Sequence, residues 1–117
     1  MNPKTDSVES RPLKRYAFIL RLRERAAEAY ERAHREVWPE MCNMLKDGGV
    51  SEYSIFRLDN LLLLTFRAVD FEITWSQFDN YPVNLRWQAA MAPLFATSEN
   101  LRSGERFPMM EEVFYLP

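Results

Sequence analysis

Three stretches of the chain have the apolar, ring-rich composition of β-strands, at residues 16–22, 50–58 and 61–68. Alternate residues of a strand point to opposite faces of its sheet, so 50–58 and 61–68 would each place apolar side chains on both faces. The Asp-Asn pair at 59–60 is suited to a tight turn. We therefore expect the second and third strands to form a hairpin.

The stretch between the first two strands predicts helix. Residues 23–34 are strong helix formers with alternating charge. Pro39 would interrupt a helix, since proline loses one backbone hydrogen bond and clashes with the preceding turn. We therefore expect a kink just before Pro39, a second helical stretch over 39–46, and a glycine cap at Gly48 or Gly49.

The second half of the chain contains two more predicted helices, a loop and a terminal strand. Residues 71–78 and 84–95 predict helices, which the Tyr81-Pro82 pair would separate. The Ser, Asn, Gly and Pro residues within 96–108 predict a loop, and 112–117 predicts a terminal strand. The predicted order is β-α-β-β-α-β.

That order defines an α+β fold of the ferredoxin-like type, with an antiparallel sheet and helices on one face. We expect a polar tail at 1–12 and a single domain at 13–117. Because the sheet would be apolar on both faces, its free face needs a cover. A second copy packed sheet to sheet would supply it, so the expected assembly is a homodimeric α/β barrel.

Composition narrows the class of partner. The 117 residues are 47% hydrophobic and 27% charged, with a net charge of −2. That charge argues against a nucleic-acid or membrane partner. Cys42 is the only cysteine and cannot form an intrachain disulfide, which fits a reducing compartment. We therefore expect a cytoplasmic protein.

One histidine dominates the candidate chemistry. His34 is the only side chain whose ordinary pKa lies near neutrality. Tyr30 precedes it by four positions, which places both side chains on one helix face if 23–34 is helical. Zinc sites need several His or Cys ligands, and this chain has one of each, so we expect no metal.

Four short motifs follow one another along the chain: Tyr30 to His34 followed by Trp38-Pro39-Glu40, Tyr53 to Phe56 before the Asn60 turn, Arg86-Trp87 with Met91, and the ending Glu112 to Pro117. With these motifs in this order, the sequence resembles the L-rhamnose mutarotase family. The resemblance implies a ferredoxin-like homodimer that acts on a monosaccharide without a cofactor. It also implies that His34 is the catalytic proton donor and that Tyr30, Tyr53 and Trp87 contact the sugar.

Gln88 departs from the family pattern, which usually has a second Trp at this position. We include Gln88 among the substrate-binding residues, because an amide favours a sugar hydroxyl where a ring favours a C–H face. L-fucose or another deoxyhexose is therefore an alternative to L-rhamnose.

Mutarotation opens a hemiacetal and closes it on the other face, which requires an acid and a base but no redox step. One histidine with nearby tyrosine hydroxyls can supply the acid and the base for these proton transfers. Two other classes remain open at this point. One is a ferredoxin-like monooxygenase-type dimer with an apolar pocket, and the other is a sugar-binding module without catalysis.

Overall fold

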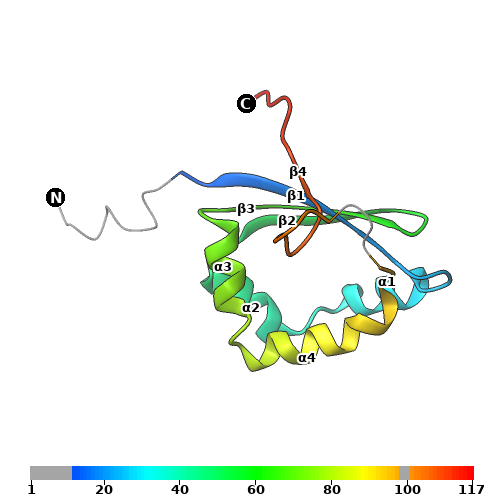
Figure 1. The fold of residues 1–117 in the computed structure, drawn as a ribbon. Helices are drawn as coiled ribbons and strands as arrows, with labels where there is room; N and C mark the ends of the chain where they lie inside the picture. The colour runs from blue at the N-terminus through cyan, green and yellow to red at the C-terminus, as the bar shows by residue number, and fades with distance from the viewer. Residues whose placement is uncertain (1–11, 98–100) are drawn as a thin grey trace.

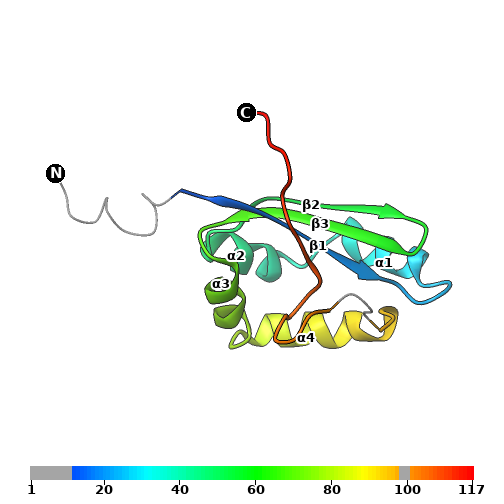
Figure 2. The same cartoon turned by 45° about the horizontal axis from the view of Figure 1, so that its top comes forward.

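A computed structural model describes residues 12–97 and 101–117, and it has two layers (Figure 1). The strands are β1 (Lys14–Arg21), β2 (Ser51–Leu58), β3 (Leu61–Ala68) and β4 (Met109–Met110). The helices are α1 (Ala27–Arg35), α2 (Pro39–Asp47), α3 (Phe71–Phe78) and α4 (Pro82–Met91), followed by a single 3₁₀ turn at Ala92–Leu94. All four α-helices lie on the same side of the sheet (Figures 1 and 2).

The sheet has the order β2-β3-β1-β4, and every neighbouring pair is antiparallel. This confirms the predicted α+β fold with strands and helices in the order β-α-β-β-α-β, each helical connection being divided into two helices. The predicted hairpin is confirmed too. Leu58 pairs with Leu61 across the turn, and Asp59 takes the left-handed conformation (φ 53°) that Asp tolerates better than most residues.

The predicted helix over 23–34 begins later than expected. Its start at Ala27 follows Arg25, whose φ of 68° cannot belong to a right-handed helix. The expected kink before Pro39 is a full break, because Trp38 is extended (φ −54°, ψ 132°) and Pro39 opens α2 as its first residue.

The predicted helix over 84–95 begins and ends earlier than expected. Pro82, which was expected to separate the two helices, opens α4 as its first residue, because the first turn of a helix tolerates proline. The helix ends at Met91, since Pro93 cannot donate its backbone hydrogen bond, and a 3₁₀ turn replaces the last predicted residues.

The predicted terminal strand at 112–117 is wrong. The last strand is the two-residue β4, which pairs with Ala17 and Phe18 of β1 and falls between the expected loop at 96–108 and the expected strand at 112–117. Residues 111–117 have no regular structure and leave the sheet on the side away from the helices (Figures 1 and 2). Within the described chain no strand lies beside them to accept their backbone hydrogen bonds. The predicted tail at 1–12 lies outside the described residues, apart from Pro12.

The core fills the space between the sheet and the helices. Phe18 of β1 and Leu62 and Phe66 of β3 are almost completely buried there. The other face of the sheet carries Ile19, Leu63 and Phe56 in the pairing register of the strands, and none of the helices in residues 12–97 and 101–117 covers it (Figure 2). We call this the open face.

Candidate active site

A cavity of about 810 Å³ lies between the helix-side face of the sheet and helices α1, α2 and α4. Tyr30 and His34 reach it from α1, Tyr53 from β2, and Trp87 and Gln88 from α4. The fold therefore brings all five residues predicted from the sequence to the same cavity, although they lie up to 58 positions apart in the chain.

His34 is held by its own helix. One ring nitrogen, Nδ1, lies 2.8 Å from the Tyr30 carbonyl oxygen. A carbonyl oxygen can only accept, so Nδ1 must carry the proton and donate it. The neutral ring then has an unprotonated Nε2, and among the described residues none bonds to this atom. Burial lowers the pKa of His34 below its ordinary 6.5, partly offset by the Tyr30 carbonyl bond, so the ring is neutral at pH 7.

Two phenols line the same cavity as this imidazole. The Tyr30 ring stacks on the His34 ring with centroids 4.1 Å apart, as the four-residue spacing predicted. Burial raises the pKa of Tyr30 to about 12. Burial also raises the pKa of Tyr53, and the neighbouring Tyr30 raises it further. Both hydroxyls therefore keep their protons and can donate hydrogen bonds.

Trp87 forms part of the cavity wall. Its ring is nearly perpendicular to the His34 ring, with centroids 5.3 Å apart, and Trp38, which does not line the cavity, packs perpendicular to Trp87 at 5.0 Å. Trp87 is buried, whereas Gln88 is exposed and lies at the rim. An apolar ring face beside polar groups is a surface that suits a sugar, which has C–H faces and hydroxyls.

Several lining residues escaped the sequence analysis. The cavity is also lined by three apolar rings, those of Trp75, Phe95 and Phe107. Two further polar side chains line it, those of Arg106 and Asn84. Arg106 forms a bidentate salt bridge with Asp79, which ties the 101–108 segment to the end of α3. No sequence period links these positions, because they reach the cavity through the tertiary fold.

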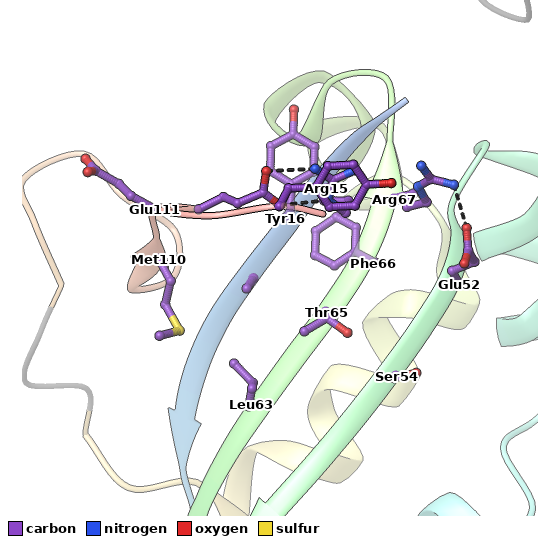
Figure 3. Close-up of a pocket in the computed structure, with 13 residues that line it drawn as sticks. Arg15, Tyr16, Glu52, Ser54, Leu63, Thr65, Phe66, Arg67, Met110 and Glu111 are labelled. Atoms are coloured by element: carbon purple, nitrogen blue, oxygen red, sulfur yellow. Dashed lines mark hydrogen bonds and ion pairs between the residues drawn. The ribbon is translucent and has the colours of Figure 1, made fainter. Parts of the chain in front are cut away.

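A second hollow of about 590 Å³ lies on the open face (Figure 3). Two ion pairs border it, one joining Arg15 to Glu112 and the other joining Arg67 to Glu52, each at 2.7 Å. Their dashed lines are visible in Figure 3. This hollow contains none of the five predicted site residues.

The part of the chain that the structure describes, residues 12–97 and 101–117, contains no cluster of three or more His, Cys, Asp or Glu side chains placed to hold a metal ion. None of its helices has the length and hydrophobicity needed to cross a membrane.

Known proteins match nearly the whole chain. Residues 15–116 match the family model described as L-rhamnose mutarotase. The L-rhamnose mutarotase of Shouchella clausii is 34% identical over 103 residues, covering 87% of this chain and 97% of that protein. The one from Escherichia coli O8 is 33% identical over 106 residues, covering 88% and 98%.

A solved structure agrees with this match. The crystal structure of an L-rhamnose mutarotase from Formosa agariphila superposes with a TM-score of 0.66 at 31% identity, covering 89% of this chain and 99% of that one. These matches define the class of the protein as a small α+β isomerase, whose largest described features are one sheet, its helices and the cavity between them. The chain belongs to the L-rhamnose mutarotase family.

Proposed function

We propose that this protein interconverts the α and β anomers of L-rhamnose in the cavity that contains His34. The observation that carries the proposal is the hydrogen bond from Nδ1 of His34 to the Tyr30 carbonyl, which leaves Nε2 as a base at the cavity. The relatives named above, all L-rhamnose mutarotases, favour L-rhamnose over L-fucose and over oxygenation of an aromatic substrate.

In this mechanism Nε2 of His34 removes the proton from the anomeric hydroxyl as the ring C–O bond breaks. A tyrosine hydroxyl, from Tyr30 or Tyr53, protonates the departing ring oxygen. The open-chain aldehyde then rotates about the bond beside its carbonyl carbon, and the two transfers reverse during closure on the other face. His34 is therefore the base in opening and the proton donor in closure, which reconciles the local geometry with the donor role implied by the family resemblance.

The remaining groups bind and orient the sugar. Trp87 offers an apolar ring to one face of the sugar, and Gln88 at the rim offers an amide to its hydroxyls. These steps involve no redox change and call for no Lewis acid or cofactor. The single half-buried thiol, Cys42, suits a reducing compartment such as the cytoplasm.

We also propose that two copies associate through their open faces and form an α/β barrel. Phe56 (59% exposed) and Met110 (51%) leave apolar surface on that face. The C-terminal segment adds Val113, Phe114 and Leu116, which are 94%, 78% and 78% exposed. Apolar side chains grouped in this way are typical of a surface that a partner covers.

The direct test of the enzymatic proposal is saturation-transfer NMR on L-rhamnose. Saturating the anomeric proton of one anomer should diminish the signal of the other when the protein is present, far beyond the spontaneous rate. L-Fucose should exchange more slowly under the same conditions. Binding of L-rhamnose without faster exchange would instead identify a sugar-binding module.

A further inference from the structure

Two side-chain amides of α4 form a short hydrogen-bonded chain at the cavity wall. Nδ2 of Asn84 donates to the Phe78 carbonyl oxygen at 3.1 Å, and Nε2 of Gln88 donates to Oδ1 of Asn84 at 3.2 Å. Asn84 is only 7% exposed, and both amides line the cavity. The four-residue spacing places the two side chains on the same face of the helix.

The carbonyl at the start of this chain fixes the direction of both amides. The Phe78 oxygen can only accept, so Asn84 must present its NH₂ group to it and turn Oδ1 away. Oδ1 can also only accept, so Gln88 must present its NH₂ group to Asn84. A free glutamine could rotate its amide by a half turn at little cost, but this one cannot without losing a hydrogen bond.

We propose that Asn84 is a positioning residue that holds Gln88 with its Oε1 available to the substrate, so that Gln88 accepts a hydrogen bond from a non-anomeric hydroxyl of the sugar. This rests on the proposed function and deepens it.

The experiment uses L-rhamnose and analogues in which each non-anomeric hydroxyl is replaced in turn by fluorine, which cannot donate a hydrogen bond. Anomer exchange is measured for the wild type and for Gln88→Leu. At one position, fluorination should raise KM for the wild type about three- to tenfold more than for Gln88→Leu. Gln77→Leu, an exposed glutamine on α3 outside the cavity, is the matched control and should behave as the wild type.

Gln88→Glu separates an acceptor from a donor. A carboxylate accepts from the sugar but would repel Oδ1 of Asn84, which also only accepts, so the change is made together with Asn84→Ala, and this double variant should retain the penalty for fluorine at that position. If Gln88 instead donates to the sugar, the double variant will lose the penalty as completely as Gln88→Leu does, and the proposal is overturned.

Asn84→Ala tests the positioning role. With Gln88 present, the freed amide can turn, so the fluorine penalty should fall at least twofold. The double variant Asn84→Ala with Gln88→Glu should instead keep the wild-type penalty, because a carboxylate presents an acceptor in either rotation. A loss that is equal in Asn84→Ala and in the double variant would mean that Asn84 acts only through the general packing of α4.

The outcomes also separate this inference from the proposed function. If the wild type accelerates no exchange of L-rhamnose, the enzymatic proposal fails. If it accelerates exchange but the fluorine penalties of the wild type and Gln88→Leu are equal at every position, the enzyme stands and the Gln88 contact is wrong.

Discussion

At the scale of single residues, the chemistry depends on which nitrogen of His34 carries a proton. A helix histidine could point either nitrogen at a ligand, and the sequence alone left the choice open. The 2.8 Å contact with the Tyr30 carbonyl decides it, because that oxygen needs a donor. In the proposed mechanism His34 therefore meets the sugar with an unprotonated nitrogen, while Tyr30 and Tyr53 meet it with O–H groups.

This arrangement predicts a pH dependence. Burial lowers the pKa of His34 below 6.5, so the imidazole is mostly neutral at pH 7 and becomes protonated only as the pH falls through that lowered value. The enzyme-catalysed exchange rate, corrected for the spontaneous rate, should be constant between about pH 7 and 8. It should decrease when the pH is lowered well below 6.5. A catalysed rate that rises steadily from pH 7 to pH 5 would require a protonated His34 as the initial acid instead.

At the scale of elements, the sequence predicted what its local patterns control. The hairpin is encoded by Asp59 between two apolar strands, and α3 begins and ends at the predicted residues because Asp70 caps it and Tyr81-Pro82 follows it. Prolines were harder to interpret. Pro82 begins a helix and Pro93 ends one. In both cases the local sequence marks a helix boundary without showing whether a helix begins or ends there.

The short strand β4 was missed for a different reason. Its two methionines have no alternating pattern, and they are extended because β1 offers an unpaired edge there. The five predicted site residues could be named because helix spacing and the family resemblance pointed to them. The role of Asn84 could not be predicted, since it depends on the carbonyl of Phe78, six residues earlier across a turn.

The cap on α3 gives a stability prediction. Oδ1 of Asp70 accepts from the backbone N–H of Ile73 at 3.0 Å. Asp70→Ala removes this bond and should lower the free energy of unfolding by about 1 kcal/mol, measured by urea denaturation. Ser76→Ala, an exposed change on the same helix, should alter it by less than about 0.5 kcal/mol. Equal effects of the two changes would show that the cap contributes nothing.

At the scale of the whole molecule, the described helices cover only one of the two faces of the sheet. Helices cover one face, and the open face has apolar residues and a projecting C-terminal segment (Figure 2). The active-site cavity lies on the helix side, so association through the open face would leave all five predicted site residues in each copy's own cavity.

The assembly can be tested at the centre of the open face. The wild type should sediment at twice the chain mass at micromolar concentration. Leu63→Glu should sediment as a folded monomer, because dimerisation would bury the introduced carboxylate without a charged partner. Leu85→Glu places the same change on an exposed position of α4, outside the open face, and should remain dimeric. A monomeric wild type, or dissociation by both variants alike, would refute the proposed interface.

The central claim is that His34 moves the proton, and its most direct test is the anomer exchange rate of His34→Asn measured by saturation-transfer NMR on L-rhamnose. Asparagine keeps a polar side chain but cannot take and return a proton near neutral pH. We predict a loss of at least about a hundredfold, with unchanged thermal unfolding and retained sugar binding. Arg35→Gln, the next residue on α1 and exposed, should exchange anomers at the wild-type rate. Exchange by His34→Asn at close to the wild-type rate would contradict the mechanism.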